Sequence, residues 1–221
     1  MDKGVVVEFD FAVANGAEVL FAAAKKFLQE LDGIKLDTPA EIRYLSGNAY
    51  QDGFTKLFAS VKTKKTPQKA ARGFAAAFAA AMTESFPTSI SPAVRNFVKT
   101  LTDRDVRLVI ATRGSLEAVA RLFGFVPSEK VTFYQETTGV YGTCRWDSWR
   151  RACHDAKLNF RSTVAVTGSG FGVKSALHAG MGSVAVVNDR VAYQDFGGAD
   201  AVIPELSGTT AKSVLKALRM P

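Results

Sequence analysis

The chain has 221 residues, 47% of them hydrophobic and 22% charged, which is typical of one globular unit with room for an insertion. Its longest apolar run, Phe74–Met82, is far shorter than the roughly 20 residues that cross a bilayer, so a membrane span is excluded. No secretory leader is expected before Val5. Two cysteines, Cys144 and Cys153, are too few for a disulfide framework, and we expect a reduced, cytoplasmic compartment.

The charge balance is 28 Lys and Arg against 21 Asp and Glu, or +7. A positive balance favours anionic partners, but the basic residues are scattered. The one run, at 62–65, directly precedes a helix-start signal at Thr66-Pro67, and we interpret it as a solvated loop. No basic patch with interleaved aromatic residues is visible, so a nucleic-acid partner is not expected.

Short β-branched runs alternate with helical patterns along the chain, which predicts an α/β fold with a parallel sheet. Several runs are apolar on consecutive residues, as in strands covered on both faces. A cap and a first-turn proline, Ser91-Pro92, predict the start of one of the intervening helices. The predicted strands are Val5–Phe9, Val106–Ala111, Val131–Tyr134, Thr163–Val166, Ser183–Val187 and Ala201–Ile203.

Residues 17–85 interrupt this alternation, because no strand is predicted there. A helical stripe from Leu20 to Leu31 ends near Gly33, and Thr38–Glu41 has the pattern of a capping box. Further helices are expected to carry Phe54, Leu57, Phe58 and Val61, and then the alanine-rich stretch after Thr66-Pro67. Phe74, Phe78 and Met82 recur there every four residues and predict a packing face.

Paired acids follow the first predicted strand. Ligands of open α/β sheets bind at the carboxyl ends of strands, and Glu8 and Asp10, two apart in a strand, would point to the same side. Such a pair suits acid–base chemistry. The alternative is that both are loop acids beyond the strand. We favour a site, because paired acids directly after Val5-Val6-Val7 are unusual in a buried strand.

The second predicted strand ends in Thr112-Arg113-Gly114-Ser115. A hydroxyl, a small residue and the start of a helix together suit an anion, although threonine and serine are also ordinary helix caps. Arg113 either faces this site or points to water, and the sequence leaves both open.

The fourth predicted strand leads into Gly168-Ser169-Gly170. With Asp189 after the next strand, this turn partly matches a dinucleotide-binding fingerprint. The third glycine of that fingerprint falls on Val173, however, where close packing of helix and strand needs glycine. We therefore disfavour dinucleotide binding.

Taken in order, these strand ends resemble the haloacid dehalogenase (HAD) superfamily of Mg²⁺-dependent phosphotransferases, in particular its helical-cap phosphoglycolate phosphatase and β-phosphoglucomutase-like group. The resemblance covers essentially the whole chain. It implies a Rossmann-like core at 1–16 and 86–221 and a helical cap at 17–85. It also implies that Thr112 is the phosphate-binding hydroxyl, and that Val164–Met181 is the fourth motif.

The chain departs from the family at its catalytic positions. Glu8 stands at the nucleophile position, Asp10 keeps the acid/base position, and Phe11-Ala12 replaces Gly-Thr. Gly168 stands where the fourth motif has a magnesium-binding Asp. No lysine matches the third motif; Thr143 or Arg145 lies nearest, and we prefer Arg145 for its charge.

These departures indicate a degenerate phosphatase site, because a reacting group misplaced by about 1 Å can cost roughly 100-fold in rate and Mg²⁺ loses an oxygen ligand. We expect weak or no Mg²⁺-dependent hydrolysis, with a small anionic or phosphorylated ligand still held by Thr112, Arg113, Gly114 and Arg145, beside Gly168 and Ser169. The alternative is an active divergent phosphatase that uses Glu8 or Asp10 as nucleophile and needs Mg²⁺, held by these two acids and another that replaces position 168. A protein partner is also compatible with the first hypothesis.

Overall fold

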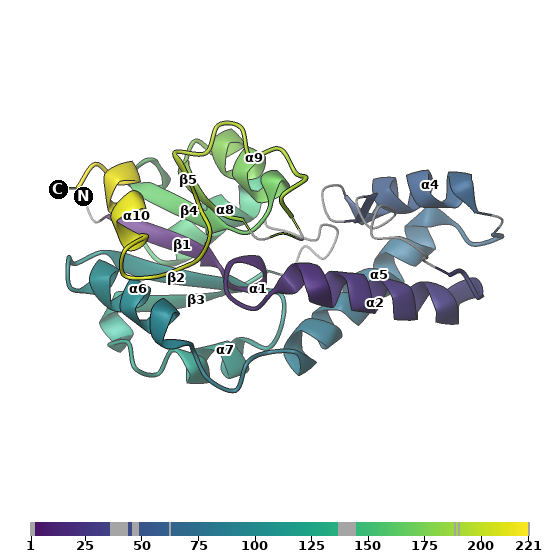
Figure 1. Cartoon of the computed structure of the whole chain (residues 1–221), viewed down its shortest axis with the longest axis horizontal. Coiled ribbons are helices and arrows are strands. Elements are labelled where there is room, and N and C mark those ends of the chain that lie inside the picture. Colours follow the sequence, from purple (N-terminus) through teal and green to yellow (C-terminus); the bar gives the residue numbers. More distant parts are fainter. Residues whose placement is uncertain are drawn as a thin grey trace.

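The computed structural model describes residues 3–35, 44–45, 49–61, 63–136, 145–187, 189 and 191–220. Its centre is a six-stranded sheet in the order β3-β2-β1-β4-β5-β6, with every neighbouring pair parallel (Figure 1). All six predicted strands are present. Their bounds are β1 Gly4–Glu8, β2 Arg107–Thr112, β3 Val131–Gln135, β4 Thr163–Thr167, β5 Gly182–Val186 and β6 Ala201–Ile203.

Helices cover both faces of the sheet, as the apolar strands predict. Val5 and Val7 face one apolar cluster, which includes side chains of α6 and α10. Val6 between them faces a second cluster with α8 and α9, because successive side chains of a strand alternate. The helices are α1 Phe9–Ala12, α2 Gly16–Asp32, α4 Tyr50–Ser60, α5 Pro67–Glu84, α6 Pro92–Thr102, α7 Leu116–Leu122, α8 Trp146–Asp155, α9 Gly170–His178 and α10 Ala211–Ala217; two 3₁₀ turns are η1 Ser128–Lys130 and η2 Phe160–Ser162.

The predicted helix boundaries are confirmed where the structure describes them. The Oγ1 of Thr66 accepts a hydrogen bond from the Lys69 amide at 3.4 Å, and the Oγ of Ser91 accepts one from Val94 at 3.3 Å. These caps satisfy amides that have no partner inside the helix. Gly33 ends α2 with φ 63°, a conformation that glycine adopts without steric cost. The predicted capping box at Thr38–Glu41 lies outside the described residues.

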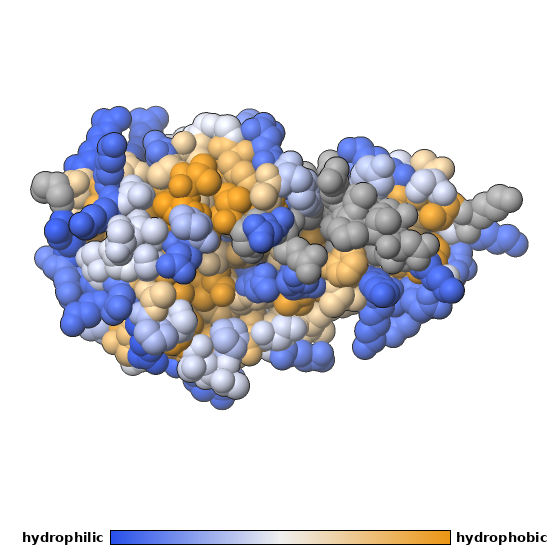
Figure 2. Space-filling model, in the orientation of Figure 1, coloured by the Kyte–Doolittle hydropathy of each residue, from blue (hydrophilic) through white to orange (hydrophobic). Residues whose placement is uncertain are grey.

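Helices α2, α4 and α5, here called the helical lobe, pack on one another beside the carboxyl ends of the strands (Figure 1). Phe74, Phe78 and Met82 are fully buried, so their predicted packing face is confirmed. Rings from all three helices meet. The ring centroid of Phe74 lies 5.6 Å from those of Phe27 and Phe54, and the centroids of Phe27 and Phe54 are 6.1 Å apart. Hydrophilic side chains line the lower edge of the lobe (Figure 2). Within the described ranges, no helix combines the length and apolar character needed to cross a membrane.

Candidate functional site

The end of β1 differs from the sequence expectation. The strand stops at Glu8, and Phe9–Ala12 form a single helical turn, α1. Asp10 therefore is not a strand residue two positions after Glu8, and the argument from strand alternation is wrong. Both carboxylates are nevertheless completely buried, and one atom joins them. The Nη1 of Arg113 lies 3.6 Å from the Oε1 of Glu8 and 3.4 Å from the Oδ2 of Asp10.

The Asp10 carboxylate accepts hydrogen bonds from two consecutive residues where β2 ends. Thr112 Oγ1 donates to Asp10 Oδ1 at 2.6 Å, and the backbone N–H of Arg113 donates to Asp10 Oδ2 at 2.8 Å. The Gly114 amide donates in turn to Thr112 Oγ1 at 3.0 Å. The donors predicted to hold a phosphate group are therefore engaged with a carboxylate of the chain itself.

Arg113 faces the acids rather than water, which decides between the two orientations that the sequence left open. The residue is only 8% exposed. Its position directly after β2, in the loop that leads to α7, brings its guanidinium over the end of the neighbouring strand β1.

The Glu8 carboxylate has a second partner on its other side. Thr167, the last residue of β4, donates its hydroxyl to Oε2 of Glu8. β4 is the other neighbour of β1 in the sheet. We call Glu8, Asp10, Thr112, Arg113 and Thr167 the strand-end cluster.

The charges in the strand-end cluster are held out of water. Burial raises the pKa of Asp10 above its ordinary value, although the Arg113 charge and the hydrogen bonds from Thr112 and Arg113 oppose that shift. Removal from water disfavours the ionised form of a carboxyl group, whereas a nearby cation favours it. Here desolvation is the larger effect, so Asp10 takes up a proton more readily than an exposed aspartate.

Gly168 follows β4 and lies against the backbone of α1. A Cβ atom at this position would be 2.4 Å from the carbonyl oxygen of Phe11 and 2.6 Å from its carbonyl carbon. Such separations are far below van der Waals contact, and the obstructing atoms are backbone. Position 168 thus accommodates no side chain in this arrangement, including the carboxylate that the resemblance would place there.

The residues described do not fit the magnesium ion that the resemblance implies. A magnesium site needs oxygen ligands in octahedral arrangement. A guanidinium group stands within 3.4–3.6 Å of both carboxylates, and position 168 has no space for a third acid. No group of three or more His, Cys, Asp or Glu side chains suited to a metal occurs in the described part of the chain.

The other predicted site residues have structural partners. Gly114 packs against Phe86, whose Cζ would be 2.3 Å from an added Cβ. Ser169 caps α9 by accepting from the Gly172 amide at 3.0 Å. Arg145 precedes α8, and its Nε lies 3.0 Å from the Oδ1 of Asp147.

The sequence interpretation missed two buried polar residues, Thr167 and Tyr50. The sequence analysis gives Thr167 no role, although a hydroxyl at the end of a central strand is positioned to contact a site at that edge of the sheet. Tyr50 at the start of α4 is 1% exposed, and its hydroxyl has no hydrogen-bond partner. No motif singles it out, because an aromatic residue in a helix predicts only packing.

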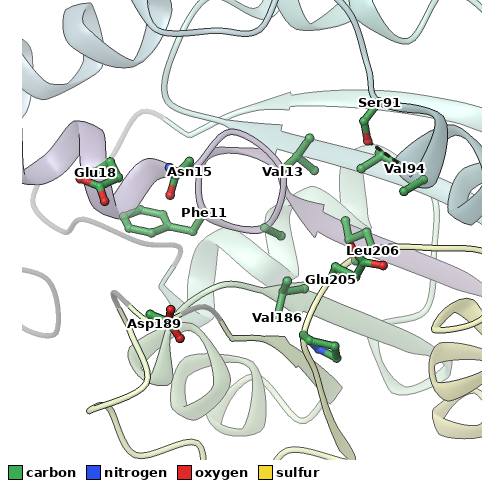
Figure 3. Close-up of a pocket in the computed structure, with 13 residues that line it drawn as sticks. Phe11, Val13, Asn15, Glu18, Ser91, Val94, Val186, Asp189, Glu205 and Leu206 are labelled. Carbon is green, nitrogen blue, oxygen red and sulfur yellow. Dashed lines mark hydrogen bonds between the residues drawn. The ribbon is translucent and has the colours of Figure 1, made fainter.

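A separate cleft of about 510 Å³ lies beside α1 (Figure 3). Phe11, Val13 and Asn15 line it from one side, and Asp189 and Glu205 from the other. Asp189, the acid considered for a ribose, thus lies in a cleft that also contains the carboxylates of Glu18 and Glu205. None of the strand-end cluster lines this cleft.

The fold is that of HAD-like hydrolases, as comparison with solved structures shows. The first is CbbY from Rhodobacter sphaeroides in complex with phosphate, with a TM-score of 0.67 and 16% sequence identity. The alignment covers 97% of this chain and 99% of the CbbY chain. β-Phosphoglucomutase from Clostridium difficile has a TM-score of 0.64 at 14% identity, and the alignment covers 99% of this chain and 98% of the mutase chain. A family IA, variant 3 HAD hydrolase from Entamoeba histolytica has a TM-score of 0.70 at 14% identity, and the alignment covers 99% of this chain and 100% of the hydrolase chain.

No protein-family model matches the sequence, and no curated protein matches it. The likeness is thus one of structure.

Proposed function

We propose that this protein is a HAD-like binding protein that has lost Mg²⁺-dependent phosphoryl transfer and takes a small anionic or phosphorylated ligand at the strand-end cluster. The observation that carries the proposal is the convergence of Thr112 Oγ1, the Arg113 amide and the Arg113 guanidinium on one buried carboxylate, that of Asp10. Such donors suit an oxyanion. A ligand anion would replace Asp10 there, with Asp10 protonated or displaced.

The loss of hydrolysis follows from the partners of both acids. An attacking carboxylate must approach phosphorus in line, and the charge that develops must be neutralised. Glu8 is held on one oxygen by Arg113 and on the other by Thr167. The described residues do not suit the magnesium ion that would neutralise the charge, because a guanidinium stands at both carboxylates and position 168 has no room for a third acid.

The remaining expectations are part of the same proposal. Residues 17–85 would form a cap domain over a core of 1–16 and 86–221, and the protein would act in the cytoplasm. The phosphate complex of CbbY supports a ligand of this chemistry, since the two chains share their fold along nearly their whole length.

Two measurements test the proposal. Hydrolysis of an aryl phosphate, with and without Mg²⁺, should stay at background. Phosphate at about 100 times its Kd should stabilise the fold by roughly 2.7 kcal/mol, which raises the melting temperature by several degrees in a chain of this size. A chloride control at matched ionic strength should give no such shift.

A variant pair assigns the binding to the strand-end cluster. Thr112→Ala removes a donor and should reduce the phosphate-induced shift. Thr100→Ala alters a half-buried threonine whose hydroxyl donates to the Asn96 carbonyl oxygen within α6, and it should leave the shift unchanged. Sulfate stays dianionic from pH 5 to 8, and its effect should grow as the pH falls, because protonated Asp10 no longer competes for the donors. Stabilisation by Mg²⁺ without any response to phosphate would contradict the proposal.

An active divergent phosphatase is the second candidate, and one observation favours it. The raised pKa of Asp10 would let it donate a proton to a leaving group. Turnover within the usual range of about 1–10³ per second would establish this candidate in place of the first.

A further inference from the structure

Tyr50 is buried in the helical lobe. It is the first residue of α4, and its ring packs edge-on against Phe74 of α5, with 4.9 Å between centroids and 75° between planes. Gly53, one turn later, lies so close to the Tyr44 carbonyl that a Cβ would be 2.3 Å from the oxygen. The backbone at Tyr44 thus packs directly on the first turn of α4.

The hydroxyl of Tyr50 is a buried polar group without a partner. The residue is 1% exposed, and its oxygen forms no hydrogen bond. Roughly nine in ten buried polar groups have one, so an exception calls for an explanation. Leaving such a group unsatisfied opposes folding, and phenylalanine would fill the same space without that cost.

The Tyr50 hydroxyl lies within electrostatic range of the strand-end cluster. Burial raises the pKa of this hydroxyl above the ordinary value of 10.0, and the charges of Arg113, Asp10 and Glu8 act on it as well. Like any phenol at neutral pH, the group carries its proton and has a hydrogen available as a donor. An oxyanion is the partner that such a donor binds most strongly.

We infer that Tyr50 is a ligand-binding residue, whose hydroxyl donates a hydrogen bond to an oxyanion held at the strand-end cluster. This inference rests on the proposed function and deepens it: the ligand would lie between the sheet edge and the helical lobe, with Arg113 on one side and Tyr50 on the other. An anion there satisfies a buried hydroxyl that has no hydrogen-bond partner in the described part of the ligand-free protein.

Calorimetric titration of the full chain with inorganic phosphate tests the inference. Tyr50→Phe removes only the hydroxyl and should weaken phosphate binding by about tenfold, the effect of losing one hydrogen bond to a charged acceptor. The melting temperature without phosphate should stay the same or rise. Tyr134→Phe, in β3 and the second apolar cluster, is the matched control and should bind phosphate as the wild type does.

The outcomes separate the inference from the proposal on which it rests. Equal phosphate affinity of Tyr50→Phe and the wild type overturns the role of Tyr50 and leaves the proposed function standing. A lower melting temperature of ligand-free Tyr50→Phe shows that the hydroxyl supports the empty fold, which also overturns the inference. No binding of phosphate to the wild type overturns both.

Discussion

The strand-end cluster and the interior of the helical lobe are both buried, but they are built in opposite ways. In the cluster, two carboxylates, one guanidinium and two hydroxyls satisfy one another within the sheet edge. In the lobe, aromatic rings pack on aromatic rings, and the hydroxyl of Tyr50 is left without a partner. Directional bonds hold the first region, and area removed from water holds the second.

This difference shows where the two regions are sensitive. A packed apolar interior tolerates swaps of similar volume, usually at less than about 1.5 kcal/mol. A buried charged cluster tolerates little, because removal of one member leaves the others desolvated and unpaired. The strand-end cluster is thus the more fragile of the two, although it contains fewer side chains.

Arg113→Ala should produce the largest effect. It leaves Glu8 and Asp10, both fully buried, without their cation, and breaking a buried ion pair costs about 3–5 kcal/mol. Urea denaturation measures the loss. Arg121→Ala is the control, since its pair with Glu117 is exposed at 73% and 81% and should contribute at most about 1 kcal/mol.

Equal losses from the two arginine variants would contradict this account of the cluster. If Arg113→Ala does not fold, Arg113→Lys serves instead: it keeps the charge, loses the planar fork and should be less stable than the wild type.

Gly168→Ala should have the next largest effect. Its Cβ would lie 2.4 Å from the Phe11 carbonyl oxygen, and α1 would have to move, at a cost of about 1–3 kcal/mol. Gly124→Ala is the control, because its nearest atom lies at 3.4 Å, an ordinary contact. Thermal denaturation of both variants measures the difference, and a harmless Gly168→Ala would show that α1 yields easily and that position 168 has room.

The strands could be predicted from sequence because local pattern determines them. Val5-Val6-Val7 and the other apolar runs are short and β-branched, and they alternate with helical segments, a pattern typical of a parallel α/β sheet. The start of α6 was equally predictable, since the Ser91 cap acts within one turn. Such signals depend on neighbours in the chain.

The site was predictable only in part, because its contacts join residues far apart in the chain. Glu8, Asp10 and Thr112 could be predicted as site residues because they lie at the ends of predicted strands. The helical turn that redirects Asp10, and the direction of the Arg113 side chain, depend on contacts across about a hundred residues. Tyr50 had no signal at all, because its unpaired hydroxyl is visible only in three dimensions.

Asp10→Asn should give the smallest effect, a change with pH rather than a large loss. Because the folded-state pKa of Asp10 is raised above 3.8, the native protein holds this proton more tightly than the unfolded chain does. That stabilisation is complete below the unfolded pKa and is lost as the pH rises through the folded pKa. Asparagine has no proton to lose, so the stability of Asp10→Asn relative to the wild type should increase from pH 3.5 to 7.5 in urea titrations.

Asp195→Asn is the control, and its stability relative to the wild type should decrease over the same pH range. Hydrogen bonds from Lys174 and Gly197 lower the pKa of that exposed carboxyl, so the wild type gains stability as the pH rises and the variant does not. A flat profile for Asp10→Asn would mean that Asp10 titrates alike in the folded and unfolded chains, and that the Arg113 charge offsets burial in full.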